Sequence, residues 1–444
     1  MRTIQIICFL LLLPLFGFSQ STLVGHWESR DTLPVHRTNM ATASLQIGDT
    51  AFVYTFMGLD STKACSSGMR LESFRYNTVS GEWKQIADVP DTEGRIAASA
   101  TGVNGKVYVI GGYKVYANCN EFSSPRVDIY DPQTDSWTLG DSTPTPIDDH
   151  VQLLYKDSLI IVISGWTQNQ NTRKVQIYDT YLDVWSDANN IIGSGKFGHS
   201  GGIWGDTIIY IDGVSSSFSH NNQTYRGVIQ NGDPHSIAWT NLGTHAGRKT
   251  YRAGGFSYSN RILFTGGTNN AYNFDGIGYN GQPSVETGRT WGYNLNSGLF
   301  EEYASNPDSV MDVREIVQVG GNEFYSVGGM EANQTVSNRV SVFIIDSVFV
   351  GVEEGVENGL GFEVFPTVIE SSLEIRKQDL DPGICNLQFH DALGRLFYSK
   401  DVEHAGGEFR LEMNFNPSEL PMGQIFLKIA TANSSQTIQL VHLK

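Results

Sequence analysis

The sequence predicts an all-β protein in which a six-bladed β-propeller is followed by a small β-sandwich. Three observations support this prediction. A pattern of short strands returns about every fifty residues, a glycine closes the second strand of each copy, and an aromatic residue opens the outer strand of most copies. Each copy has room for the strands of one blade, and a closed ring of blades leaves no open sheet edge.

The clearest copy of the repeat spans residues 106–137. Lys106–Ile110 is an apolar, β-branched run that ends in a diglycine, and Arg126–Tyr130 alternates polar and apolar residues. A turn that contains Asp and Pro then leads to Trp137 at the start of the outer strand. The preceding strand, Ile96–Val103, is rich in Ala, Ser and Gly, which suits the crowded innermost position near the propeller axis.

The same landmarks recur along the chain and predict how the ring closes. The glycines that end the second strands are Gly58, Gly112, Gly165, Gly213, Gly267 and Gly329. The aromatic residues that open the outer strands are Trp83, Trp137, Trp185, Trp239 and Phe300. No such residue follows Gly329, whereas Trp27 precedes the first copy. We therefore expect the strand around Trp27 to complete the last blade, beside the strand near Val340–Ile345, and to close the ring without a covalent bond.

The period and its diglycine, Tyr and Trp landmarks resemble those of the kelch β-propeller family over roughly residues 21–346. The resemblance implies the fold. It leaves the function open, because this fold carries enzymes as well as binding proteins.

The two ends of the chain indicate export. Residues 1–20 place one Arg ahead of about a dozen apolar residues and predict a secretory signal peptide, too short to be a membrane anchor. Residues 21–349 form the predicted propeller, 350–361 an acidic, Gly-rich linker, and 362–444 the predicted sandwich of short alternating strands. We expect no membrane insertion, and the formal net charge of -17 argues against a nucleic-acid partner.

The C-terminal domain resembles the type A C-terminal sorting domain of the type IX secretion system of Bacteroidetes. The matching motifs are FEVFPTVIESSLEI, FHDALGRLFYSKDV and LPMGQIFLKI. The resemblance implies that the type IX machinery carries the chain across the outer membrane and that a sorting protease removes this domain. The propeller would then be secreted or attached to the outer cell surface.

Two cysteines occupy equivalent places in the first two blades. Cys65 and Cys119 each lie seven residues after the glycine that ends the second strand. Equivalent loops of neighbouring blades emerge on the same face, and export permits oxidation. We expect a disulfide between them; two free thiols that coincide by chance are the alternative.

One cationic or potentially cationic residue lies at or just before the innermost strand of each blade. These residues are Arg37, Arg95, His150, His199, Arg252 and Arg314. A ring of such groups around the channel mouth would suit a carboxylate or another anionic ligand. The alternative is that they make hydrogen bonds to backbone carbonyls between blades.

The loops on this face are rich in aromatic and amide side chains. The loop Thr268–Arg289 is unusually long and contains Tyr272 and Asn273. Aromatic rings with amides are suited to a sugar, whose ring packs on the aromatic face while its hydroxyls reach fixed polar groups. Ordinary long loops also contain these residue types.

The second half of the propeller is similar to bacterial N-acetylneuraminate epimerases. The similarity covers AGGFSYSNRILFTGG at Ala253–Gly267 and the spacing from Asp212-Gly213 to Arg226. It implies a catalytic role for Arg226. The family's partner acid would directly follow Gly213, where this chain has Val214. Ring opening needs an acid–base group, so the departure weakens the enzymatic interpretation.

The sequence therefore predicts a secreted or cell-surface module that binds a glycan or a protein through its loop face. The alternative is a carbohydrate-active enzyme of the sialic acid epimerase, or mutarotase, type. The histidines are scattered without metal-ligand spacing, so we expect neither a metal nor a cofactor.

Overall fold

The computed structural model describes residues 20–351, 361–366, 368–369, 371–391, 396–416, 420–421, 423–431 and 435–442. Nearly all of the predicted signal peptide and most of the predicted linker lie outside these ranges. The chain separates into two compact units, one spanning Ser21–Val350 and one that contains Gly351–Lys444.

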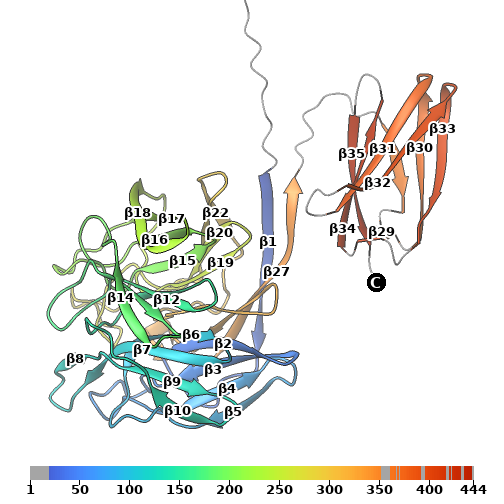
Figure 1. The fold of residues 1–444 in the computed structure, drawn as a ribbon. Helices are drawn as coiled ribbons and strands as arrows, with labels where there is room; N and C mark the ends of the chain where they lie inside the picture. The colour runs from blue at the N-terminus through green and yellow to red at the C-terminus, as the bar shows by residue number, and fades with distance from the viewer. Residues whose placement is uncertain are drawn as a thin grey trace, which may run out of the picture. The chain divides into compact units, whose positions relative to one another are not determined.

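The unit Ser21–Val350 is a ring of six antiparallel sheets, the blades of a propeller (Figure 1). Blades one and two consist of β2 (Ala41–Ile47), β3 (Thr50–Phe56), β4 (Ser73–Asn77) and β5 (Glu82–Ile86), then β6 (Ile96–Val103), β7 (Lys106–Val115), β9 (Val127–Asp131) and β10 (Ser136–Leu139), with β8 (Glu121–Ser123) added to β7. Blades three and four consist of β11 (Val151–Tyr155), β12 (Leu159–Ile163), β13 (Val175–Asp179) and β14 (Val184–Ala188), then β15 (Ser200–Trp204), β16 (Thr207–Ile211), β17 (Gln223–Gln230) and β18 (Asp233–Thr244). Blade five consists of β19 (Gly254–Tyr258), β20 (Arg261–Thr265), β21 (Thr290–Asn294) and β22 (Phe300–Tyr303).

The last blade joins the two ends of the propeller, as the sequence predicts. Its strand order is β1 (Gln20–Arg30), β27 (Val340–Gly351), β24 (Glu323–Val327) and β23 (Val317–Val319). Figure 1 shows β1 and β27 side by side. The ring of Trp27 packs on Phe343 of β27 with centroids 5.3 Å apart. The N-terminal strand is therefore the outer strand of the sixth blade.

The outer-strand tryptophans also bond each blade to its neighbour. The indole N–H of Trp83 donates to the carbonyl of Asp31 at 2.9 Å, and that of Trp137 to Ala87 at 2.9 Å. Trp185 and Trp239 make the same bond to Asp141 and Asn189. The aromatic residue at this position in blade five is Phe300, whose side chain has no N–H and cannot make this bond.

Small residues let the innermost strands converge. A Cβ atom at Gly102 on β6 would lie 1.9 Å from the carbonyl oxygen of Ser44 on β2. A Cβ atom at Gly255 on β19 would lie 2.2 Å from the carbonyl oxygen of Gly201 on β15. Any side chain at these two positions would push the neighbouring blades apart.

The other unit is a β-sandwich. A three-stranded sheet contains β28 (Glu363–Phe365), β30 (Ser372–Leu380) and β33 (Gly407–Asn414), and a five-stranded sheet contains β29 (Val368–Ile369), β35 (Ser435–His442), β34 (Gly423–Ala430), β31 (Gly383–Asp391) and β32 (Leu396–His404). Leu373 and Ile375 from the first sheet and Leu387 and Phe389 from the second lie in one buried core. The pairing is antiparallel except that β29 runs parallel to β35.

Candidate functional site

One residue in each blade, at or just before the innermost strand, has a left-handed backbone. These residues have φ between 52° and 65° and are Asn39, Ala97, Asp149, Gly198, Arg252 and Asp312. Asn, Asp and Gly tolerate this conformation best. Backbone N–H groups link several of these positions: Asp149 donates to Ala97 at 3.1 Å, Gly198 to Asp149 at 3.0 Å and Arg252 to Gly198 at 2.9 Å. The repeated position thus joins successive blades near the axis.

Two arginines and two aspartates pair within this layer. Arg252 of blade five binds both carboxylate oxygens of Asp149 of blade three, at 3.1 and 2.8 Å, and binds Asp312 at 3.1 Å. Arg314 also binds Asp149 and donates to the amide oxygen of Asn39 at 2.8 Å. Burial acts to raise the pKa of Asp149, but the charges of Arg252 and Arg314 outweigh it and hold that pKa below its usual range. The cations here are neutralised by the protein's own carboxylates.

The six residues expected to form a cationic ring therefore do not form one. Arg37 and Arg95 lie two residues before the left-handed position, His150 and His199 one after it, and Arg314 two after it. The six residues therefore do not occupy equivalent positions in the repeat.

Arg37 and Arg95 bond within the blades. Arg95 is fully buried and binds Asp91 at 2.8 Å and Asp128 at 2.5 Å, while Arg37 lies 3.4 Å from Glu72. Both arginines serve the packing of blades one and two.

His150 and His199 are buried around the channel and carry no charge at neutral pH. Burial lowers the pKa of His150 to about 4 and that of His199 to about 3. His199 Nε2 lies 3.1 Å from the carbonyl oxygen of Ile163, and His150 Nε2 lies 3.2 Å from the Gln152 side-chain oxygen.

A chamber opens on the loop side of the charged layer. This cavity of about 190 Å³ is lined by Tyr113, Glu121, Asp148, Asp149, Trp166, Phe197, Phe218, Arg252, Asn273 and Tyr279. Blades two to five supply these residues. Five of the ten side chains are aromatic, and three are carboxylic. We call this cavity the loop-face chamber.

The aromatic side of the loop-face chamber reaches the surface. Phe218 and Tyr279 are each 44% exposed, and their ring centroids are 4.2 Å apart. The ring of Trp166 stacks on that of Phe218 with centroids 6.0 Å apart, and Trp166 is the less exposed of the two. A ligand can therefore contact aromatic faces at the rim and further in.

The two other carboxyl groups of the chamber differ from Asp149. Burial raises the pKa of Glu121, although a hydrogen bond from Asn273 and the charge of Arg252 oppose the shift. Burial, and then the negative charge of Asp149, raise the pKa of Asp148 well above its usual range. A carboxyl group with a raised pKa keeps its proton to a higher pH and can then donate a hydrogen bond, whereas the ionised Asp149 can only accept. The chamber therefore contains both donors and acceptors.

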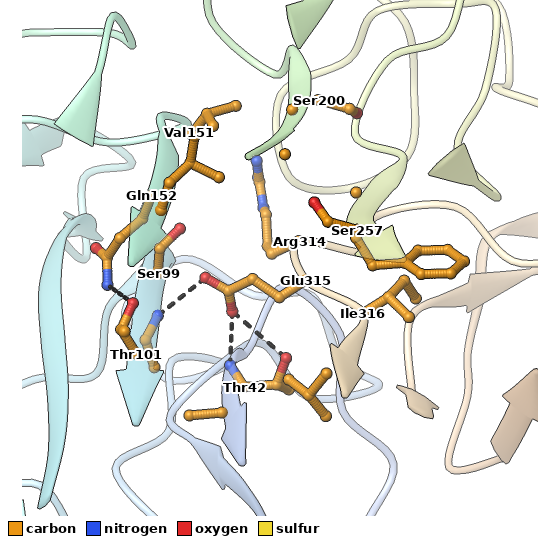
Figure 2. A pocket seen from close by; sticks show the side chains of 18 of the residues that line it. Thr42, Ser99, Thr101, Val151, Gln152, Ser200, Ser257, Arg314, Glu315 and Ile316 are labelled. Atoms are coloured by element: carbon orange, nitrogen blue, oxygen red, sulfur yellow. Dashed lines mark hydrogen bonds between the residues drawn. The ribbon is translucent and has the colours of Figure 1, made fainter. Parts of the chain in front are cut away.

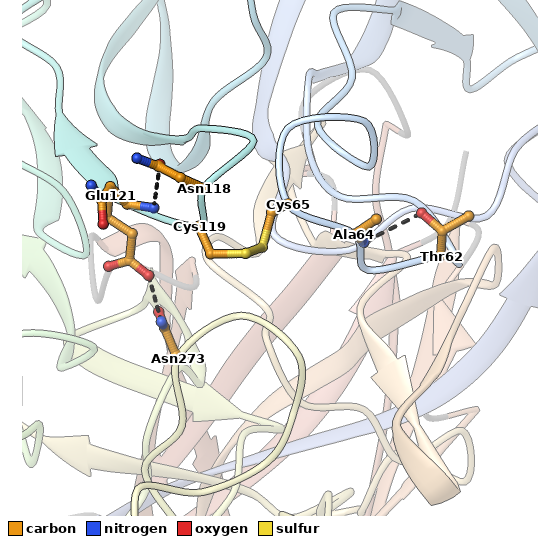
Figure 3. Close-up of a disulfide and its surroundings, with 8 residues drawn as sticks. Thr62, Ala64, Cys65, Asn118, Cys119, Glu121 and Asn273 are labelled. Carbon is orange, nitrogen blue, oxygen red and sulfur yellow. Dashed lines mark hydrogen bonds between the residues drawn. A yellow bond between two sulfur atoms is a disulfide. The ribbon is translucent and has the colours of Figure 1, made fainter.

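A disulfide between Cys65 and Cys119 ties a loop of blade one to a loop of blade two. Figure 3 shows it close to Glu121, whose carboxylate accepts a hydrogen bond from Asn273 of the long blade-five loop. Asn273 therefore lines the loop-face chamber. Tyr272 is fully buried beneath it, with its ring 4.9 Å from the Arg252 guanidinium.

Arg226, the candidate catalytic residue, lies outside the loop-face chamber. It is exposed on β17, the third strand of blade four, opposite Thr240 and Ile209 in the neighbouring strands. It lines neither the loop-face chamber nor the channel described next. The structure does not bring Arg226 to the other predicted site residues.

A second cavity, the axial channel, lies among the innermost strands and has a volume of about 290 Å³. Its wall includes His150, His199, Arg314 and Glu315. The Glu315 carboxylate accepts hydrogen bonds from the backbone N–H groups of Thr42 and Ala100, both at 2.9 Å. Figure 2 shows Glu315 beside Thr42. Burial raises the pKa of Glu315 to about 7 in spite of these bonds.

Sequence reasoning missed the acidic residues Glu121, Asp148, Asp149, Asp312 and Glu315. A signal was present for two of them, because Asn39, Asp149 and Asp312 occupy one repeat position and are residue types that favour the left-handed backbone. In the described part of the chain, no three His, Cys, Asp or Glu side chains come together as a metal site. The same residues contain no helix of the length and apolarity needed to cross a bilayer.

Known proteins resemble part of the chain in sequence. The Kelch motif family matches residues 94–144. Kelch-like protein 38 of Rattus norvegicus and that of Homo sapiens are each 36% identical over 78 residues, which is 18% of this chain and 13% of theirs. Kelch-like protein 35 of Mus musculus is 27% identical over 117 residues, 26% of this chain and 18% of its own. The chain therefore spans only a small part of these relatives.

A solved structure, that of YjhT, resembles the chain over a longer stretch. It covers 70% of this chain and 99% of its own, with a TM-score of 0.57 and 15% identity. At this identity the likeness concerns the fold alone. Together with the motif match and the closed ring of six blades, it identifies Ser21–Val350 as a β-propeller of the kelch type.

Proposed function

We propose that the propeller is a binding module that holds a carbohydrate residue in the loop-face chamber. The observation that supports this most directly is the composition of that chamber: five aromatic rings beside an amide and three carboxyl groups. Pyranose rings pack on aromatic faces, and fixed polar groups orient their hydroxyls. A protein ligand that inserts a side chain into the same chamber is the alternative.

An epimerase or mutarotase activity has less support. That interpretation depends on Arg226, which is exposed and away from both cavities. Epimerisation through ring opening would need an acid–base group beside that arginine, and Val214 stands where the family has its acid. We therefore do not assign a reaction to this chain.

The binding test is a glycan array probed with the full chain, followed by titration of any hit. Phe218→Ala removes an exposed ring from the chamber rim, and we expect it to weaken binding about tenfold, because one ring stacked on a sugar contributes about 1 kcal/mol or more. Tyr181→Ala is the matched control, since Tyr181 is 71% exposed in a blade-three turn outside the chamber. If no glycan binds, or if Phe218→Ala binds like the control, the carbohydrate proposal is wrong.

We also propose that the type IX machinery exports the chain and that a sorting protease removes residues 362–444. The support is the N-terminal apolar segment, the motifs of the last domain and a disulfide that suits an oxidising compartment. In a bacterium that has this system, deletion of residues 362–444 should leave the propeller in the periplasm. Recovery of the truncated protein in the medium or on the surface would contradict the proposal.

A further inference from the structure

Two carboxyl groups of the loop-face chamber have no basic side chain paired with them. Within residues 20–351, no ion pair involves Glu121 or Asp148. Glu121 accepts a side-chain hydrogen bond from Asn273 (Figure 3), and Asp148 accepts one from the Ser123 hydroxyl at 2.5 Å. Asp149, by contrast, binds two guanidinium groups. The chamber thus holds carboxyl groups that could still bind a cation.

The cation that lines the chamber is already engaged. Arg252 binds Asp149 through two nitrogens, and its third contacts Asp312 and the carbonyl of Asn273. An acidic ligand would therefore face Glu121 and Asp148 with no free positive charge in the wall. Burial disfavours the ionised form of both groups and so raises the pKa of each, and a cation placed beside them would favour ionisation.

The rings around these carboxyls favour a cation as well. Aromatic faces attract ammonium and guanidinium groups at about 6 Å or less from the ring centroid. The propeller already uses this attraction beside the chamber, where the Arg252 guanidinium lies 5.0 Å from the ring of Tyr251 and 4.9 Å from that of Tyr272. The chamber wall also contains the rings of Trp166, Phe218 and Tyr279, which pack on one another and line the cavity.

We infer that the loop-face chamber selects a ligand that bears a protonated amine, placed between the carboxyl groups of Glu121 and Asp148 and the aromatic rings. This inference rests on the proposed carbohydrate binding and narrows it to an amino sugar with a free amine. An N-acetylated sugar would lack the charge, and an acidic sugar would meet charge of its own sign. This inference differs from the anionic ligand that the cationic residues of the sequence suggest.

The test compares three probes on the full chain by calorimetry: the disaccharide of glucosamine, the same disaccharide with both amines acetylated, and glucuronic acid. The first two share ring stereochemistry and differ in charge. We expect the free-amine disaccharide to bind about tenfold more tightly than the acetylated one, because an ion pair shielded by aromatic rings contributes about 1–2 kcal/mol. Glucuronic acid should bind more weakly than either.

Glu121→Gln and Asp148→Asn keep the shape of the chamber and remove the carboxyl groups whose ionised forms would pair with the amine. Each should abolish most of the preference for the free amine and leave binding of the acetylated disaccharide nearly unchanged. Glu82→Gln is the control, because Glu82 is exposed on β5. Circular dichroism and the retained binding of the acetylated probe show that the variants are folded.

The outcomes separate the inference from the function on which it rests. Equal or tighter binding of the acetylated or acidic probe, or a preference unaffected by both substitutions, overturns the inference while the carbohydrate function stands. If no glycan of any charge binds here or on the array, the proposed function and the inference are both wrong.

Discussion

The two cavities along the propeller axis differ in what builds them. The axial channel is lined mainly by innermost strands, whose Ser, Thr, Ala and Gly residues are kept small by the convergence of the blades. The loop-face chamber is lined largely by connections, where the chain is free to place Trp166, Phe218 and Tyr279. Because the loops are free of the packing limits of the axis, large aromatic side chains collect at that end of the propeller.

Arg252 belongs to the walls of both cavities. With Asp149, Asp312 and Arg314 it forms a charged layer between them, and this layer joins blades three, five and six. Buried charge along the axis is thus of two kinds: ion pairs that join the blades, and carboxyl groups without an ion-pair partner that line the two cavities.

The largest effect should follow when the shared layer is broken. Asp149→Ala removes the partner of two buried guanidinium groups, and we expect a loss of stability on the order of 5 kcal/mol, the upper end for breaking a buried pair. Denaturant unfolding followed by tryptophan fluorescence measures it. Asp233→Ala, at an exposed carboxylate of β18, is the control, and a similar small loss in both variants would refute a structural role for the layer.

Removing the disulfide between Cys65 and Cys119 should lower the stability of the propeller. It links residues 54 apart in the sequence, and the replacement of both Cys65 and Cys119 by Ser should cost about 4 kcal/mol through the added freedom of the unfolded chain. Thermal unfolding with and without reductant measures the loss, and the double variant should not respond to reductant. Cys385→Ser in the sandwich is the control; a wild-type protein insensitive to reductant would contradict the prediction.

Glu315 in the axial channel should make the stability of the protein depend on pH. Because the folded-state pKa of Glu315 is about 7 and its ordinary value is 4.5, the folded protein holds the extra proton between these values. Stability therefore falls as pH rises from about 4.5 to 7, by up to about 3 kcal/mol, and then levels off.

Glu315→Gln should remove this slope. Paired unfolding curves of the wild type and the variant at pH 5, 6 and 7, compared by their difference, isolate Glu315 from the other titrating groups. The Gln variant loses one acceptor for the Thr42 or Ala100 N–H at every pH, so the slope and not the offset is the test. Parallel curves would show that Glu315 does not titrate in this range.

Much of the fold could be predicted because its signals are local and repeated. A glycine at the end of a strand and a Trp at the start of another mark each blade, and the unmatched Trp27 indicated which blade the N-terminal strand would complete. The seven-residue offset of Cys65 and Cys119 likewise placed them in equivalent loops, and the structure joins them.

The candidate site was less predictable, because it depends on distances across the axis. The six cationic residues looked equivalent along the chain, yet they occupy four different offsets from the left-handed position and bind different partners. Asp149 and Arg252 are 103 residues apart and form a bidentate pair. Nothing local to either residue indicates the other.

The sequence by itself determined the number of blades, the strand that closes the ring and the loops that share a face, because each follows from short-range periodicity repeated along the chain. Only the tertiary structure decided which charges are neutralised, which carboxyls stay unpaired and which rings surround them. The physical reason is that the strength of a buried charge depends on its nearest neighbours in space, and in a closed ring those neighbours come from blades far apart in the sequence.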